Sequence, residues 1–167
     1  MGGSRAGRGT MKFEMTEVSE RPYLYVERTT GMDPEEIGAA MGAAFGEVAA
    51  FLQEHDIAPT CPPLSAYYDF DPEKLTFRAG FPVAETDLER AAGTIEAGTL
   101  PAGRVMTFTH VGPYARLRDS YAELMAHMAE NGLEFAGPAW ESYVDDPAKV
   151  PEDELRTVVY VMVAGPE

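Results

Sequence analysis

The sequence lacks the features that usually mark a disulfide, a metal centre or a membrane span. Its only cysteine, Cys61, excludes an internal disulfide and has no cysteine or histidine partner at the spacing of a metal site. No apolar run approaches the ~20 residues of a membrane-spanning helix, and the Gly-rich opening over residues 1–10 has no signal-peptide core. Phosphate-loop and nucleophile-elbow motifs are absent as well. We therefore expect a cytoplasmic protein with no metal and no other cofactor.

Basic side chains are also scarce. Lys and Arg together number 13 against 28 Asp and Glu, which gives the 167-residue chain a formal net charge of −15. Two of the arginines lie within residues 1–10, a segment that we expect to be a disordered tail. Because such a charge opposes contact with phosphate backbones and anionic lipids, we expect no direct binding to nucleic acid or membranes.

The most informative segment runs from Pro138 to Pro147 and places a carboxylate among aromatic residues in a predicted strand. Side chains of a strand alternate between its two faces, so Glu141 shares a face with Tyr143 while Trp140 lies on the other. A carboxylate on a face that packs against a core is costly unless a cation or hydrogen-bond donors meet it. Glu141 is therefore either a ligand-binding carboxylate or a solvated residue on an exposed sheet face.

An earlier segment of the chain repeats this pattern. Residues 63–72 carry Pro, Tyr, Asp and Pro at the spacing of residues 138–147, an offset of 75 that makes Tyr68 the counterpart of Tyr143. The preceding segments correspond at an offset of 76, which relates Phe45 to Tyr121. These two offsets predict a tandem duplication with a one-residue slip in the connecting loop, in which two copies of one unit bury a shared face.

The sequence pattern of each half predicts the element order β-α-β-β. Asp33 and Pro34 are typical of the N-cap and first position of a helix, which should end near His55. The second helix should begin near Pro113, after a polar connector over residues 85–98.

The strand that contains Gly80 and Pro82 is expected at a sheet edge or at a bulge. The unbroken apolar run Val158–Val163 predicts instead a strand that is covered on both faces.

The length suits one domain with one core. We expect this domain over residues 11–167, with repeat one at about 11–84 and repeat two at about 99–167. The predicted fold class is α+β, a tandem of pseudo-symmetric repeats whose antiparallel sheet has helices on one side and a ligand cleft between the halves.

The second half also carries a series of short motifs that point to a family. They are Leu100-Pro101-Ala102-Gly103, His110-Val111-Gly112-Pro113-Tyr114, Trp140-Glu141-Ser142-Tyr143, Asp146-Pro147 and Glu154-Leu155-Arg156-Thr157. In this order they resemble the GyrI-like effector-binding domain, which occurs free-standing and as the ligand-binding half of AraC- and MerR-type multidrug regulators. The resemblance runs from about Met11 to Val163. Only the short Gly-rich tail precedes it, so we expect any DNA-reading part of a regulator to lie on another chain.

The resemblance implies an aromatic cleft whose central glutamate meets lipophilic cations, and Glu141 is the matching position. Tyrosine and tryptophan faces attract such cations through cation–π contacts of roughly 0.5 to 2 kcal/mol each. We expect Tyr68 and Tyr143 to form facing walls of this cleft, although each aromatic residue also fits a core or rim position. The predicted ligand-binding residues are Glu141, Tyr143, Tyr68, Trp140, Tyr160, Phe81, Phe108 and Met41.

Three classes of function fit these features. The first is a receptor or sink for hydrophobic, often cationic or polyaromatic, small molecules. The second is a hydrolase of cyclopropane-containing alkylating compounds, known within the family, with Glu141 as general base and Tyr143 as proton donor. The third is a module that inhibits DNA gyrase, as the family name implies.

His110 is a separate candidate because it ends a predicted strand next to Gly112 and Pro113. A hydrogen-bonded role at the start of the following helix competes there with a role as catalytic base or haem ligand. Haem is considered because SOUL-type haem binders have the same duplicated fold.

Overall fold

The computed structural model describes residues 12–68, 73–146 and 148–165. The predicted tail over residues 1–10 and the turn residues Asp71, Pro72 and Pro147 lie outside these ranges. The described chain forms β1 (Glu14–Val18), β2 (Arg21–Gly31), α2 (Pro34–Glu54), β3 (Leu64–Tyr67), β4 (Lys74–Pro82), η1 (Glu85–Arg90), β5 (Glu96–Leu100), β6 (Gly103–Val111), η2 (Tyr114–Arg116), α3 (Leu117–Glu130), β7 (Glu134–Tyr143), η3 (Glu152–Glu154) and β8 (Arg156–Ala164).

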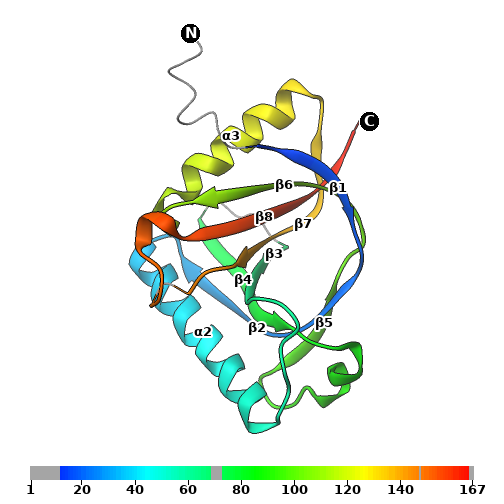
Figure 1. The fold of residues 1–167 in the computed structure, drawn as a ribbon, viewed down its shortest axis with the longest axis vertical. Coiled ribbons are helices and arrows are strands. Elements are labelled where there is room, and N and C mark those ends of the chain that lie inside the picture. The colour runs from blue at the N-terminus through cyan, green and yellow to red at the C-terminus, as the bar shows by residue number, and fades with distance from the viewer. Residues whose placement is uncertain (1–11, 69–72, 147, 166–167) are drawn as a thin grey trace.

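The strands form one antiparallel eight-stranded sheet in the order β1-β6-β8-β7-β3-β4-β2-β5. The sheet curls, and Figure 1 shows α2 and α3 on the left of it with the edge strands β1 and β5 on the right. The units β2-α2-β3-β4 and β6-α3-β7-β8 meet at the central pair β3 and β7. The predicted α+β fold of two β-α-β-β units is therefore confirmed.

The order of the sheet also shows a strand exchange between the halves. β1, at the start of the first half, pairs with β6 of the second half. β5, at the start of the second half, pairs with β2 of the first. Each half thus supplies one edge strand to the other, a connection that the β-α-β-β prediction did not contain.

β5 corrects the prediction of a polar connector over residues 85–98. This segment forms the short 3₁₀ helix η1 and then begins β5, although Glu96, Ala97 and Gly98 have weak strand propensity. Gly98 is needed at this position, because a Cβ there would lie 2.9 Å from Tyr25 Cε1 and 3.2 Å from Tyr23 Cε1. The absence of a side chain lets β5 lie against these two stacked rings.

β4 corrects the prediction of an edge strand or bulge at Gly80 and Pro82. It lies inside the sheet between β3 and β2, in continuous register. Gly80 is needed because a Cβ there would come within 2.7 Å of the Tyr25 Cβ on the neighbouring strand. Pro82 is the last residue of β4, where a missing N–H disturbs the ladder least.

The first helix follows its predicted signals closely. The Asp33 side chain caps α2 by accepting a hydrogen bond from the Glu36 N–H at 3.3 Å, and the helix ends with His55 as its C-cap. The second helix starts later than expected: a single 3₁₀ turn, η2, follows Pro113, and α3 begins at Leu117.

Apolar clusters pack on both faces of the sheet. α2 packs on the first half and α3 on the second, each with its own apolar cluster. A third cluster packs on the face away from the helices. Its buried members are Tyr23, Tyr25, Leu64, Ala66, Leu100, Val105 and Trp140.

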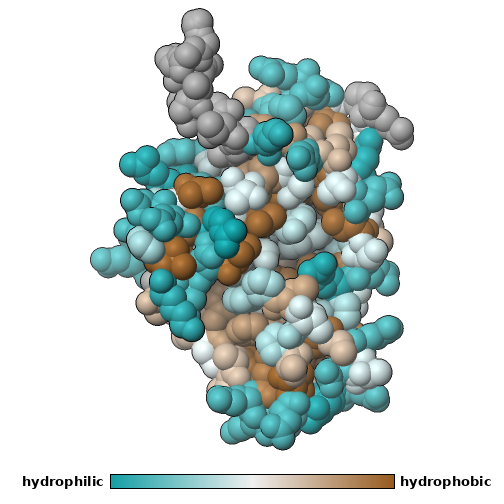
Figure 2. All heavy atoms as spheres, viewed as in Figure 1, coloured by the Kyte–Doolittle hydropathy of each residue, from teal (hydrophilic) through white to brown (hydrophobic). Residues whose placement is uncertain are grey.

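The outer surface is mainly hydrophilic at its periphery. In the view of Figure 1, Figure 2 shows hydrophilic residues around the periphery and neutral or apolar residues across the middle. Within the described ranges, no helix is both long and apolar enough to cross a membrane.

Candidate functional site

A buried glutamate lies at the centre of the sheet, on the face that the helices cover. Glu141 of β7 pairs across the sheet with Ser65 of β3 on one side and Val159 of β8 on the other. Its side chain is 5% exposed. The Glu141 carboxylate therefore lies near the boundary between the two halves and is almost fully removed from water.

Three tyrosine hydroxyls donate hydrogen bonds to this carboxylate. The Tyr143 hydroxyl lies 2.6 Å from Oε1, and the Tyr67 hydroxyl lies 3.2 Å from the same oxygen. The Tyr121 hydroxyl lies 2.6 Å from Oε2. The donors come from β7, β3 and α3, so both halves of the duplication hold the carboxylate in place.

Further aromatic rings surround the three tyrosines. Phe45 of α2 and Tyr114 of η2 contact the Tyr143 ring edge-on, at centroid distances of 5.8 and 5.6 Å. Phe108 meets the Tyr121 ring at 6.2 Å, and Phe81 meets Phe45 at 6.2 Å. Glu141 thus lies at the centre of an aromatic cluster that α2, α3 and the sheet build together.

The electrostatics of the site follow from burial. Burial raises the pKa of the Glu141 carboxyl above its ordinary value, and the hydrogen bonds from Tyr121, Tyr143 and Tyr67 oppose this shift without cancelling it. Burial, followed by the charge of Glu141, raises the pKa of all three tyrosine hydroxyls. The tyrosines therefore remain protonated donors, and no basic side chain in the described chain is hydrogen-bonded to Glu141.

His110 lies nearby and is held in one orientation. Its side chain is 5% exposed, with Nε2 3.0 Å from the Pro113 carbonyl oxygen and Nδ1 2.7 Å from the Ser120 hydroxyl. Because a carbonyl only accepts, Nε2 carries a proton and donates it to Pro113, while Nδ1 is hydrogen-bonded to the Ser120 hydroxyl. These contacts fit the predicted hydrogen-bonded role at the start of the helix.

Only part of the predicted residue set comes together at Glu141. Tyr143 contacts the carboxylate, while Phe81 and Phe108 lie one ring further out. Met41 belongs to α2 and packs against the apolar core of the first half.

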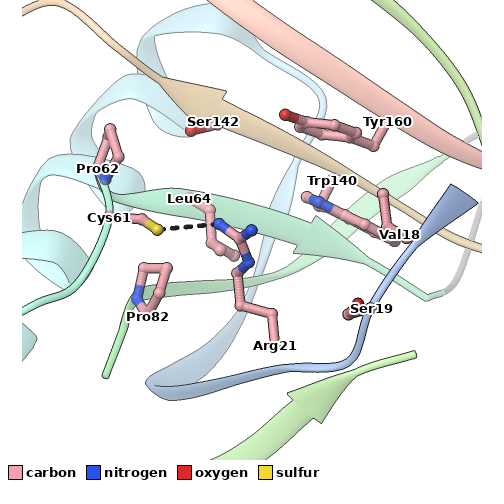
Figure 3. A pocket seen from close by; sticks show the side chains of 10 residues that line it. All are labelled: Val18, Ser19, Arg21, Cys61, Pro62, Leu64, Pro82, Trp140, Ser142 and Tyr160. Carbon is pink, nitrogen blue, oxygen red and sulfur yellow. Dashed lines mark hydrogen bonds between the residues drawn. The ribbon is translucent and has the colours of Figure 1, made fainter. Parts of the chain in front are cut away.

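Trp140 and Tyr160 lie on the opposite face of the sheet, where their rings stack at 5.6 Å and line a separate cavity (Figure 3). The prediction that they share a cleft with Glu141 is therefore corrected. The reason is strand alternation, which turns Trp140 away from its neighbour Glu141.

Tyr68 is likewise on the other face and does not face Tyr143. It is 43% exposed, and the Arg78 guanidinium lies 4.3 Å above its ring. Tyr67 takes the expected place at the carboxylate. Tyr143 follows Tyr67 by 76 residues, the same offset that relates the helices, so the slip in the duplication falls after this strand.

Sequence reasoning also missed the site roles of Tyr121, Phe45 and Tyr114. The offset of 76 pairs Phe45 with Tyr121, and each ring contacts a member of the Glu141 cluster. The equivalence was visible in the sequence, but a position in a helix stripe gave no sign that these rings reach the centre of the sheet. Across the described ranges, no group of His, Cys, Asp and Glu side chains could hold a metal ion.

Solved structures of several proteins share this fold. The C-terminal domain of EcmrR matches with a TM-score of 0.75 and 20% identity, over 94% of this chain and 99% of that chain. In an EcmrR–DNA complex, the match has a TM-score of 0.78 and 16% identity and covers 98% of this chain but 62% of that chain. SAV2435, in a structure with bound tetraphenylphosphonium, matches with a TM-score of 0.65 and 11% identity over 92% of this chain and 94% of that one.

A hydrolase from Listeria innocua matches with a TM-score of 0.63 and 16% identity over 98% of each chain. At these identities, the likeness shows a shared fold. The comparison with curated proteins gave no match. The sequence itself matches the family described as GyrI-like small molecule binding domain over residues 11–164. The chain therefore belongs to the GyrI-like small molecule binding domain family.

Proposed function

We propose that this protein binds hydrophobic organic cations and that Glu141 meets their positive charge. The observation that carries the proposal is a buried carboxylate whose hydrogen-bond partners are three tyrosine hydroxyls and no basic side chain. A cation at this position offsets the cost of burying the carboxylate. The surrounding rings offer apolar surface and cation–π contacts. Membership of a small molecule binding family and the tetraphenylphosphonium bound to SAV2435 support this choice of ligand.

Access to the carboxylate requires movement of the rings that cover it, because Glu141 is only 5% exposed. Tyr114 is the most accessible of the surrounding rings at 38% exposed, and it packs edge-on against Tyr143. It belongs to η2, a single 3₁₀ turn with no side-chain cap. We place the opening at Tyr114, whose displacement uncovers Tyr143 and then Glu141.

The test compares two ligands of nearly equal shape, the cation methyltriphenylphosphonium and the neutral triphenylphosphine oxide. Glu141→Gln should weaken binding of the cation by roughly 1.5 to 3 kcal/mol, about 10- to 150-fold, because it removes a charge-assisted contact. Its effect on the oxide should stay within about twofold. Isothermal titration calorimetry measures both affinities.

Glu123→Gln is the matched control, since it removes one negative charge from the exposed surface of α3. It should leave both affinities unchanged. Equal losses for the cation and the oxide in Glu141→Gln would show that the carboxylate does not set charge preference.

A second candidate function is hydrolysis of cyclopropane-containing alkylating compounds. The observation that favours it is the pair of hydroxyls, Tyr143 and Tyr121, at 2.6 Å from opposite oxygens of a carboxyl with raised pKa. Glu141 would take a proton from water as the water oxygen attacks a ring carbon. The breaking C–C bond would deliver its electron pair to a conjugated carbonyl, and Tyr143 would protonate the resulting oxyanion.

Mass spectrometry of such a compound incubated with the protein separates the candidates. A product heavier by one water that forms over many turnovers supports the hydrolase, and Glu141→Gln should then slow turnover by about 10² to 10⁴-fold. Protection of one compound per protein supports a sink. Full turnover by Glu141→Gln would rule out this mechanism.

The proposal places the protein in the cytoplasm, where a separate regulator chain or DNA gyrase would respond to ligand binding. The net charge of −15 supports the prediction that this chain does not itself bind nucleic acid. EcmrR, with which the chain shares its fold, has been solved in complex with DNA, and this chain covers 62% of that protein.

A further inference from the structure

A cavity lies on the face of the sheet opposite Glu141. Its volume is about 80 Å³, and its walls come from the end of β1, the start of β2, the segment before β3 and the strands β7 and β8. Because side chains alternate along β7, Trp140 and Ser142 line this cavity while Glu141 faces away from it. A single water needs roughly 10 to 15 Å³, so the cavity has room for a small organic group.

The charged side chain in the cavity wall is basic, although the protein as a whole is acidic. Arg21 is the one charged residue among those that line it, and no carboxylate does. Four other arginines of the described chain pair with carboxylates, for example Arg28 with Glu47 and Arg156 with Asp145. Arg21 instead donates from Nη1 to the Cys61 sulfur at 3.0 Å, a weak acceptor (Figure 3). Most of the guanidinium N–H groups are therefore available to an anion.

The wall offers further hydrogen-bond donors. The Trp140 indole N–H and the hydroxyls of Ser142 and Tyr160 take part in none of the side-chain hydrogen bonds found among the described residues. Figure 3 shows the Tyr160 hydroxyl directed toward Ser142, with the Trp140 and Tyr160 rings one above the other. The two rings are stacked at a centroid distance of 5.6 Å and an interplanar angle of 19°, and both contribute apolar surface to the cavity wall.

We propose that this cavity is a binding site for a small organic acid, with its carboxylate on Arg21 and its hydrocarbon part against Trp140 and Tyr160. The planar guanidinium fork matches a carboxylate through two parallel N–H···O bonds. The unpaired donors of the wall complement the same ligand, and no lining group repels it. The two faces of β7 then bind opposite charges, a cation at Glu141 and an anion at Arg21.

The test uses Trp140 as its reporter, because it is the only tryptophan in the chain. Benzoate and its neutral isostere benzamide are titrated against the whole protein with excitation selective for tryptophan. Benzoate should produce a saturable change in fluorescence, and benzamide should bind at least tenfold more weakly. Arg21→Met keeps the aliphatic stem, removes the charge and should weaken benzoate by about tenfold or more.

Controls separate this site from Glu141 and from general charge effects. Arg118→Met removes one positive charge from the exposed surface of α3 and should leave benzoate affinity unchanged. Arg21→Met should not alter the affinity for methyltriphenylphosphonium. If Arg21→Met fails to fold, Arg21→Lys, which keeps the charge but loses the fork, should weaken benzoate severalfold.

Three results would overturn the proposal. They are equal affinity for benzoate and benzamide, unchanged benzoate affinity in the Arg21 variant that folds, and no saturable signal up to about 10 mM benzoate. None of these bears on the cation site, so failure here is distinguishable from failure of the proposed function.

Discussion

At the scale of single residues, the site depends on one position at which the two halves of the duplication carry different residues. Ser65 and Glu141 are direct partners across β3 and β7, and they are separated by 76 residues, the offset that relates the two halves. Both side chains are buried. The duplication therefore places a hydroxyl beside a carboxylate at the centre of the sheet, which avoids the repulsion that two buried carboxylates would feel.

The raised pKa of Glu141 predicts a pH dependence of stability. The folded protein holds the Glu141 proton more tightly than the unfolded chain does, so this residue favours folding most below its unfolded pKa. That contribution is lost as pH rises through the folded pKa, by about 1.4 kcal/mol for each unit between the two values. Glu141→Gln cannot ionise, so its free energy of unfolding relative to wild type should rise between acidic and neutral pH.

Urea denaturation at a series of pH values measures this difference directly. Glu123→Gln again serves as the control, because its exposed position should give a difference that does not change with pH. If the free energy of unfolding of Glu141→Gln relative to wild type is also independent of pH, the tyrosine hydroxyls compensate completely for the burial of the carboxylate.

At the scale of elements, the edge strand β5 forms because of its contacts with neighbouring side chains. Tyr23 and Tyr25 stack at 4.9 Å and are almost fully buried, with Gly98 of β5 in contact with their rings. Sequence propensity gave no reason to expect a strand at Glu96–Leu100. Pairing with β2 and contact with these rings outweigh propensity here, so the strand forms through tertiary contacts.

We predict that Gly98→Ala destabilises the protein by about 1 to 3 kcal/mol, because the added methyl must displace buried tyrosine rings. Gly42→Ala is the matched control. Gly42 is exposed in the middle of α2, and an added Cβ would meet no atom within 4 Å. This change should therefore stabilise the protein by roughly 0.5 to 1 kcal/mol. Thermal and urea unfolding measure both, and a stabilising Gly98→Ala would contradict the packing described for β5.

At the scale of the whole molecule, the features that the sequence predicts are those set by neighbouring residues. The features that it does not predict depend on how distant strands pair. The helix start at Asp33 and the face of Glu141 were predictable, because capping and strand alternation involve neighbouring residues. The choice between Tyr67 and Tyr68 required the pairing register of β3 with β7, on which the two offsets disagreed. The face of Trp140 followed from alternation, but the apolar core on that side required the curl of the complete sheet.

Because the halves exchange edge strands, one half of this chain would not form a complete sheet by itself. A β-β-α-β-β fragment would leave its first strand without a partner and its second strand with an open edge. Two copies would satisfy both by swapping those strands, which makes an intertwined dimer the natural state of a half-length chain. In a symmetric dimer, the central position would hold two carboxylates or two hydroxyls. Only a chain that carries both halves can place a single glutamate opposite a serine, and so only the fused chain can bury one carboxyl group, rather than two, at its centre.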